Sequence, residues 1–198
     1  MGTIEALAPS QISKTFKNSF LPHDSPHPGE TPAEYAARLT VRFLVDAPLE
    51  HRRELAQFFT PIEVARFMAT LARPTRSVRH LLDPGAGMGI LACALCEMLP
   101  VGSGPIHLDA YEVDPTLSSF CETTLGYAKQ WLKERGISFT FQVKQTDYVL
   151  GNAVRLRPGL FDGAAPLGYD IAIANPPYFK LSKLDPRAVA SRFAAAAQ

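Results

Sequence analysis

Four short apolar runs, separated by segments with helical periodicity, dominate the middle and the end of the chain. The last run, which leads into Asn175, is continuous instead of alternating with polar residues, which is typical of a strand buried on both faces of a parallel sheet. The runs cover residues 79–83, 106–111, 138–143 and 169–174, and helical patterns cover residues 88–99 and 115–135 between them. Strands that alternate with helices predict an α/β unit whose parallel strands have the order 3-2-1-4.

Two helices are predicted before the first strand, and both begin with the same signature. Thr31-Pro32-Ala33-Glu34 and Thr60-Pro61-Ile62-Glu63 each place a threonine before a proline, with a glutamate three residues after the threonine. This spacing allows a reciprocal cap, and proline suits the first turn. The first helix, to about residue 45, offers an apolar face of Tyr35, Leu39, Phe43 and Leu44, and the second, to about residue 72, offers Val64, Phe67, Met68 and Leu71 as one buried stripe.

The composition describes a globular chain with little excess charge. It has 198 residues, of which 46% are hydrophobic and 20% charged, and a net charge of +1. A strongly basic nucleic-acid-binding module would look different, so any DNA contact must use a local basic surface or another region. No apolar stretch approaches the length of a membrane span, and no membrane partner is expected. Three cysteines, an odd number, argue against a disulfide framework and predict a reducing compartment, the cytoplasm.

No metal site is predicted from the cysteines and histidines. Cys93 and Cys96 have C-x-x-C spacing, but both lie inside a predicted helix and no second pair accompanies them. Small buried residues are the better interpretation. His23 and His27 have no nearby cysteine that would complete a ligand set.

These patterns divide the chain into four parts. Residues 1–30 predict a flexible N-terminal arm, and residues 31–75 predict N-terminal helices that include the block Phe58-Phe59-Thr60-Pro61. Residues 76–185 form a partial α/β core, and residues 186–198 form a tail.

A polar feature follows the carboxyl end of each predicted strand. In chain order these features are Asp83 with the glycine turn of Gly85 and Gly87, then Glu112, then Asp147, then Asn175. Ligands bind at this edge of open α/β sheets, and a glycine turn lets a ligand approach the backbone closely. A P-loop is excluded, because no Gly-Lys-Ser/Thr follows the turn. Glu112 lies about 20 residues past the turn, close to the spacing at which an acidic residue binds ribose hydroxyls.

The fourth strand ends in Asn175-Pro176-Pro177-Tyr178. Two prolines cannot continue a central strand, so an amide, stiff carbonyls and an aromatic ring are expected at its carboxyl end. The Asn175 side-chain oxygen and the Pro176 carbonyl suit the two hydrogens of an amino group on a π-system, and Tyr178 suits stacking on that ring. The pattern therefore favours transfer to an amino nitrogen.

In this order the motifs resemble the gamma class of adenine-N6 DNA methyltransferases, which serve restriction–modification systems and use S-adenosylmethionine. The motifs are FFTP at residues 58–61, DPGAGMG at 83–89, YEVDP at 111–115, QTDY at 145–148 and NPPY at 175–178, so the resemblance covers residues 50–180. It implies a Rossmann-like methyltransferase fold and a function in restriction–modification or phage defence.

The resemblance also implies a role for each motif residue. Phe58, Phe59, Thr60 and Pro61 would border the methionine moiety of the cofactor, Asp83, Gly85 and Gly87 would form the cofactor loop, Glu112 would hold the ribose and Asp147 the cofactor adenine. Asn175, Pro176, Pro177 and Tyr178 would be the catalytic tetrapeptide, acting on an adenine flipped out of double-stranded DNA.

The chain departs from the family in two respects. Met88 stands where the family more often has Ser or Thr, which removes one possible hydroxyl contact to the cofactor. Few residues follow NPPY, whereas the resemblance implies three further strands and a DNA-recognition domain. The expectation is an N-terminal piece, truncated after the fourth strand, that needs a C-terminal region or partner subunit to read DNA and is inactive alone.

Three alternatives remain open. One is a methyltransferase acting on a protein glutamine, because that family also ends its fourth strand in NPPY. The FFTP block favours DNA. Another is an rRNA amino-group methyltransferase, which would usually carry a more basic appendage. The third is an inactive, truncated remnant that binds the cofactor and transfers nothing.

Overall fold

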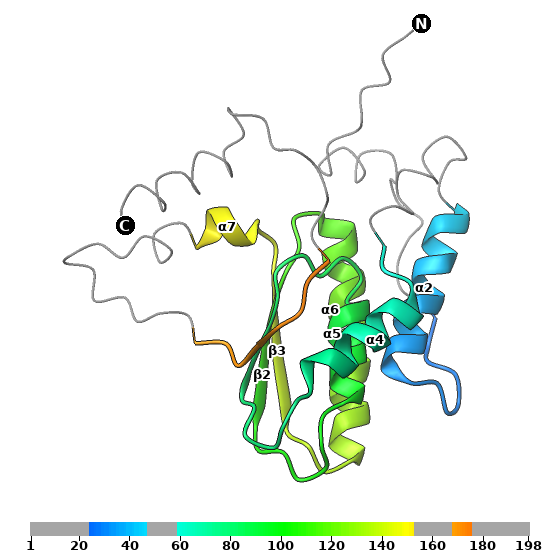
Figure 1. Cartoon of the computed structure of the whole chain (residues 1–198). Coiled ribbons are helices and arrows are strands. Elements are labelled where there is room, and N and C mark those ends of the chain that lie inside the picture. The colour runs from blue at the N-terminus through cyan, green and yellow to red at the C-terminus, as the bar shows by residue number, and fades with distance from the viewer. Residues whose placement is uncertain (1–23, 47–58, 153–167, 176–198) are drawn as a thin grey trace, which may run out of the picture.

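A four-stranded parallel sheet forms the centre of the computed structural model, which describes residues 24–46, 59–152 and 168–175 (Figure 1). Its strands are β1 (His80–Asp83), β2 (Ile106–Tyr111), β3 (Phe139–Lys144) and β4 (Ile171–Ala172). Their order is β3-β2-β1-β4, and all three neighbouring pairs are parallel, which confirms the predicted topology. The strand order reverses between β1 and β4, the kind of position at which open α/β sheets bind ligands.

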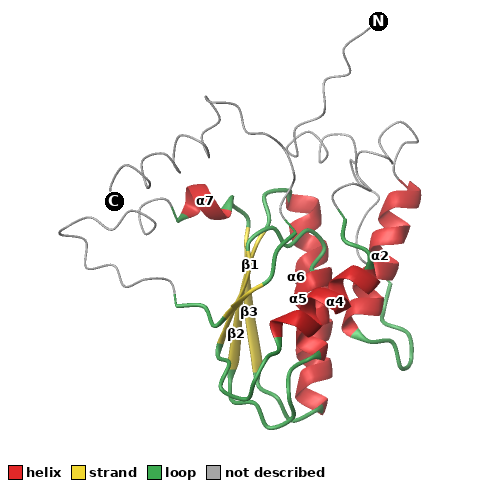
Figure 2. Cartoon of the chain, in the orientation of Figure 1, coloured by secondary structure: helices red, strands yellow, loops and turns green. Residues whose placement is uncertain are grey.

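Four of the five described helices lie on one side of this sheet (Figure 2). These are α2 (Pro32–Asp46), α4 (Ile62–Ala72), α5 (Ile90–Glu97) and α6 (Pro115–Glu134), whereas the short α7 (Tyr148–Gly151) follows β3. Helix α5 contacts α2, α4 and α6 and is buried from Ile90 to Cys96. A helix with apolar residues on all sides suits this central position. None of the helices in the described ranges is long and apolar enough to cross a membrane.

The helix-covered face of the sheet supplies the main hydrophobic core. Leu81, Leu108, Phe139 and Ile173 are at most 4% exposed in this core, and Cys93, Cys96 and Cys121 are buried and unpaired. The opposite face carries a polar network instead. Asp109 on β2 accepts a hydrogen bond from the Tyr169 hydroxyl at 2.7 Å and pairs with Lys144 Nζ at 2.8 Å.

The α4 helix faces the core mainly with its small residues. The predicted buried stripe is therefore wrong at three of its four positions, whereas Met68 is partly buried against the core. Ala65 and Ala69 are fully buried, whereas Val64, Phe67 and Leu71 are 45–63% exposed. Small side chains let α4 lie close against α5, and this close approach turns the large apolar residues outward. Periodicity identifies the helix but does not decide which of two partly apolar faces is inside.

Helix α2 begins with the reciprocal cap that the sequence predicts. Glu34 Oε2 accepts a hydrogen bond from the backbone N–H of Thr31 at 2.9 Å, and the Thr31 hydroxyl accepts one from the N–H of Glu34 at 3.4 Å. At α4 the same signature has a different outcome. Pro61 is the N-cap residue and no side chain caps the helix, so Thr60 keeps its hydroxyl for another partner.

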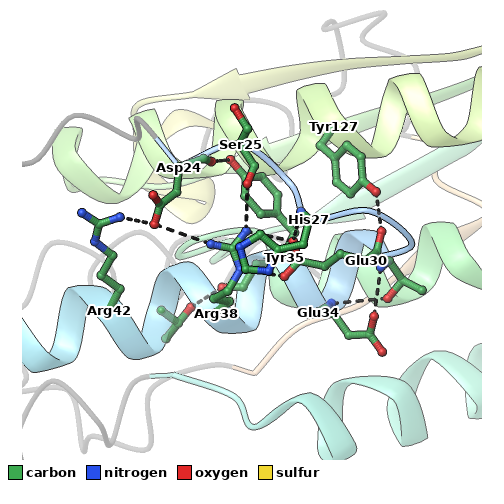
Figure 3. Close-up of polar contacts among 12 residues, drawn as sticks. Asp24, Ser25, His27, Glu30, Glu34, Tyr35, Arg38, Arg42 and Tyr127 are labelled. Atoms are coloured by element: carbon green, nitrogen blue, oxygen red, sulfur yellow. Dashed lines mark hydrogen bonds and ion pairs between the residues drawn. The ribbon is translucent and has the colours of Figure 1, made fainter.

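The segment before α2, in the predicted N-terminal arm, is held by hydrogen bonds and ion pairs (Figure 3). The Tyr35 hydroxyl donates to the carbonyl of Asp24 at 2.6 Å, and the Tyr127 hydroxyl of α6 donates to the carbonyl of Glu30. Arg38 pairs with the carboxylates of Glu30 and Asp24. Residues 24–30 are therefore fastened to both α2 and α6.

Helix α6 has the boundaries that its sequence predicts. Asp114 Oδ1 accepts hydrogen bonds from the N–H groups of Thr116 at 2.8 Å and Leu117 at 3.0 Å, and Pro115 occupies the first turn. Gly136, with φ of +72°, follows its end. This left-handed conformation is common just past a helix and favours glycine.

Candidate functional site

The predicted site residues that the structure describes gather around the carboxyl edge of the sheet. Asp83 ends β1, Glu112 directly follows β2, Asp147 follows β3 and Asn175 follows β4. Because the strands are parallel, their carboxyl ends share one edge. Phe58, Pro176, Pro177 and Tyr178 lie outside the described residues, and their roles stay predictions.

The glycine turn after β1 is tied to the end of β2. Glu112 Oε2 accepts a hydrogen bond from the backbone N–H of Gly87, and its Oε1 accepts one from the N–H of Asp114, both at 2.8 Å. The carbonyl of Tyr111 also accepts from the N–H of Ala86 at 2.9 Å. Burial raises the pKa of Glu112, and the two N–H donors partly oppose that shift. Each carboxylate oxygen retains a lone pair that can accept from a ligand hydroxyl.

Glycine is required at the end of this turn by both conformation and space. Gly89 has φ of +83°, and a Cβ on it would lie 2.7 Å from the Thr124 hydroxyl oxygen. That hydroxyl, on α6, donates a hydrogen bond to the carbonyl of Met88 at 2.8 Å and so links α6 to the turn. Sequence reasoning missed Thr124, because nothing in its local pattern separates it from an ordinary helix residue.

Met88 packs inward, which gives its side chain a structural role. It is 1% exposed in a second cluster with Tyr35, Phe43 and Phe120, which joins α2 to α6 beneath the turn. Met88, which stands where the family more often has Ser or Thr, therefore provides apolar packing between the glycine turn and α2.

Asp83 is the most unusual ionisable group at this edge. Its side chain is fully buried, and neither carboxylate oxygen makes a well-formed hydrogen bond with any described residue. Burial raises the pKa of Asp83 to about 7, and the charge of Glu112 adds to the rise. The backbone N–H groups of Gly85 and Ala92 lower the pKa of Asp83, but less than burial raises it. A buried carboxylate that has no cationic partner among the described residues suits a positively charged ligand group.

The FFTP block meets both the glycine turn and the fourth strand. Phe59 packs edge-on against Phe43, with 6.0 Å between ring centroids, and its ring lies 4.0 Å from the position that a Gly87 Cβ would take. Thr60 is 6% exposed, and its hydroxyl oxygen accepts a hydrogen bond from Asn175 Nδ2 at 3.0 Å. Two motifs more than a hundred residues apart in the sequence are thus in direct contact.

Only the nitrogen of the Asn175 side-chain amide forms a hydrogen bond with a described residue. Its nitrogen bonds Thr60, whereas no residue that the structure describes donates a hydrogen bond to its oxygen, Oδ1. An amide oxygen accepts up to two hydrogen bonds. The side chain therefore has acceptor capacity for a ligand N–H group at the carboxyl end of β4.

Asp147 acts as a helix cap in the structure. Its Oδ1 accepts from the N–H of Leu150 at 3.0 Å at the start of α7. The next residue, Tyr148, packs edge-on against Tyr111 with 5.0 Å between centroids. The predicted contact of Asp147 with the cofactor adenine stays a prediction.

Comparisons with known proteins bear on these features. No family model matches the chain. The chain is 31% identical to the type II methyltransferase M.BsuBI of Bacillus subtilis over 147 residues, which is 71% of this chain and 28% of that protein. It is 29% identical to M.AccI of Acinetobacter calcoaceticus over 138 residues, covering 69% of this chain and 21% of that protein. The chain is a relative of the type II methyltransferases.

This relationship confirms the resemblance predicted from the motifs at the level of type II methyltransferases. A third such enzyme, M.PstI of Providencia stuartii, is 26% identical over 132 residues. The chain spans about a quarter of the length of these relatives, between 21% and 28%.

Solved methyltransferase structures resemble the chain only at low similarity. The O-methyltransferase TomG of Streptomyces achromogenes, solved in complex with S-adenosylmethionine, has a TM-score of 0.43 and 19% identity over 73% of this chain and 53% of its own. An O-methyltransferase of Bacillus cereus has the same TM-score, 0.43, with 13% identity over 84% of this chain and 59% of its own. The fold assignment rests on the strand order and parallel pairing of the chain itself.

Proposed function

We propose that this type II methyltransferase relative transfers a methyl group from S-adenosylmethionine to N6 of adenine in double-stranded DNA, within a restriction–modification system. The observation that carries the proposal is the Asn175 side chain at the carboxyl end of β4, whose oxygen accepts no hydrogen bond from any residue that the structure describes. The relationship to type II methyltransferases supports the reaction class and the DNA substrate. The adenine specificity rests on the NPPY motif.

The residues around the glycine turn fit S-adenosylmethionine. Glu112 would accept hydrogen bonds from the ribose hydroxyls, since both of its oxygens keep a free lone pair beside the turn. Asp83, which is buried and has no cationic partner among the described residues, would balance positive charge on the cofactor. Phe59 would cover the methionine moiety from the side of α2. When bound, the cofactor supplies an electrophilic methyl group on a sulfonium.

Asn175 would select and prepare the acceptor. Its Oδ1 would accept one hydrogen of the exocyclic amino group, and the Pro176 carbonyl would accept the other. Holding both hydrogens directs the nitrogen lone pair away from the ring and towards the methyl donor. Tyr178 would stack on the adenine, a contact worth about 1–3 kcal/mol. Base flipping costs a few kcal/mol, so stacking and hydrogen bonds offset it only in part.

DNA binding would need phosphate contacts beyond those that a near-neutral chain offers, given its net charge of +1. We propose that a further region, in the same polypeptide or in a partner subunit, reads the target sequence. We also propose a cytoplasmic location, because the three cysteines are buried and unpaired.

The proposal is tested with the full-length protein, by methyl incorporation from radiolabelled S-adenosylmethionine into DNA, rRNA and a protein with an exposed glutamine. Nucleoside analysis of the DNA product then identifies the methylated base. N6-methyladenine in the DNA supports the proposal. Label in rRNA or protein only, or methylcytosine in DNA, overturns it in favour of another acceptor. Binding of S-adenosylmethionine without methyl transfer to any acceptor would mean that the protein is an inactive remnant of a methyltransferase.

A further inference from the structure

We propose that Thr60 is a positioning residue that holds the Asn175 amide with its oxygen towards the acceptor. This inference rests on the proposed function and deepens it, because the motif resemblance places Thr60 beside the cofactor. In the structure its hydroxyl instead bonds Asn175 Nδ2 at 3.0 Å. The contact links the block before α4 directly to the residue that would bind the reacting nitrogen.

Thr60 is well placed to fix the position of the Asn175 side chain. It is 6% exposed, and its hydroxyl is not used to cap α4, whose N-cap is Pro61 in an extended conformation with φ of −60° and ψ of 147°. The hydroxyl oxygen of a threonine that precedes a helix ordinarily accepts a hydrogen bond from a backbone N–H group of the first helical turn. Here that capacity is left for Asn175.

The helix behind Thr60 is itself anchored at several points. Arg66 of α4 donates to Glu97 of α5 at 3.2 Å, to Glu34 of α2 at 3.1 Å and to the Thr31 hydroxyl at 3.0 Å. Ala65 and Ala69 bring α4 close against the core. A hydroxyl at the start of this helix is therefore a fixed reference point for the amide.

The direction of the amide decides whether it helps or blocks the transfer. With Nδ2 on Thr60, Oδ1, to which no described residue donates, can accept a hydrogen from the acceptor amino group. Turned over, the amide would present an N–H donor to the amino nitrogen, and that bond would occupy the lone pair that must attack the methyl group. Because a hydroxyl can also donate, Thr60 acts by fixing the position and plane of the amide, and the structure has the productive arrangement with Nδ2 on that hydroxyl before the acceptor arrives.

The test compares Thr60→Val with Thr60→Ser in the full-length protein. Valine keeps the shape and removes the hydroxyl, whereas serine keeps the hydroxyl. At saturating cofactor, the single-turnover rate of methyl transfer to DNA should fall about tenfold in Thr60→Val, the loss expected for one hydrogen bond. In Thr60→Ser it should stay near wild type. Thr70→Val is the matched control, because Thr70 is exposed on α4 and its hydroxyl donates to the carbonyl of Arg66 within that helix.

Two further readouts separate positioning from other roles. Cofactor affinity, measured by calorimetry, should be unchanged in Thr60→Val, and the side-chain amide resonances of Asn175 should shift in that variant and not in Thr70→Val. Loss of cofactor affinity with an unchanged transfer rate would overturn the inference and make Thr60 a cofactor contact. An unchanged rate in an active enzyme would also overturn it. If the wild type methylates no base, the proposed function fails, and this role for Thr60 fails with it.

Discussion

Glu112 holds the glycine turn through a 2.8 Å hydrogen bond from the backbone N–H of Gly87 to its Oε2. The bond joins the residue after β2 to the turn after β1. Because the other oxygen bonds the N–H of Asp114, the carboxylate is fixed in orientation by two backbone donors. A ligand that bonds this carboxylate would meet a group that needs no further ordering.

We therefore expect Glu112→Ala to weaken S-adenosylmethionine binding more than Asp114→Ala does. Glu112→Ala removes acceptors for the ribose and releases the turn, and we expect a loss of affinity of about 10- to 100-fold. Asp114→Ala keeps the backbone N–H that bonds Glu112 and removes only the cap of α6, so unfolding free energy should fall by about 0.5–2 kcal/mol with little change in affinity. Calorimetric titration and urea unfolding measure the two quantities.

Glu112→Gln provides a matched control for charge. The amide keeps one acceptor oxygen but places an N–H donor against one of the two backbone N–H groups. Affinity should lie between those of the wild type and Glu112→Ala. Equal affinity losses in the Glu112→Ala and Asp114→Ala variants would contradict the ribose assignment.

Asn175→Ala should abolish transfer and leave cofactor affinity nearly intact. In the proposed function Oδ1 binds the acceptor amino group, so its loss should lower the single-turnover rate by at least about 100-fold, as for other side chains that bind the reacting group. Asn175→Asp retains an acceptor oxygen and should keep more activity than the alanine variant. A large fall in cofactor affinity in Asn175→Ala would instead place this side chain on the cofactor.

Strand order and the carboxyl-edge placement of the predicted polar residues follow from sequence, because both depend on local patterns repeated along the chain. The contact between Thr60 and Asn175 does not, since it joins segments 115 positions apart and the capping signature at Thr60 predicts a different bond. The orientation of α4 was mispredicted for a similar reason. Ala65 and Ala69 face inward because α5 approaches closely, and that approach is a tertiary property.

The orientation of α4 predicts opposite responses to two substitutions on that helix. Phe67 is 63% exposed, so Phe67→Ala should change the unfolding free energy by less than about 0.5 kcal/mol, as surface substitutions usually do. Ala69 is fully buried against α5, so Ala69→Leu should overpack the interface and cost about 1–3 kcal/mol. Urea unfolding of both variants distinguishes the two faces. A loss above about 2 kcal/mol in Phe67→Ala would mean that its ring is buried.

The buried carboxyl of Asp83 predicts a specific pH dependence of stability in the cofactor-free protein. Its pKa rises from 3.8 to about 7 on folding because of burial, so the folded protein holds the proton more tightly than the unfolded chain. The resulting stabilisation is fully present below about pH 4 and is lost as the pH rises through about 7. Asp83→Asn is neutral at every pH and should lack this loss. Relative to the wild type, the variant should therefore gain up to about 1.4 kcal/mol per pH unit within this window.

Urea unfolding of the wild type and Asp83→Asn at pH 5, 6, 7 and 8 measures that difference, and Asp170→Asn is the control. Asp170 accepts hydrogen bonds from the N–H groups of Arg79 and His80, which lower its pKa. A lowered pKa gives stability that is present above the unfolded value and lost only in acid, so Asp170→Asn should run parallel to the wild type from pH 5 to 8. Saturating S-adenosylmethionine should reduce the slope of the wild type, because positive charge beside Asp83 favours its ionised form. If Asp83→Asn also runs parallel to the wild type without cofactor, Asp83 is ionised throughout this pH range, and a hydrogen-bond donor or a cation must stabilise its charge.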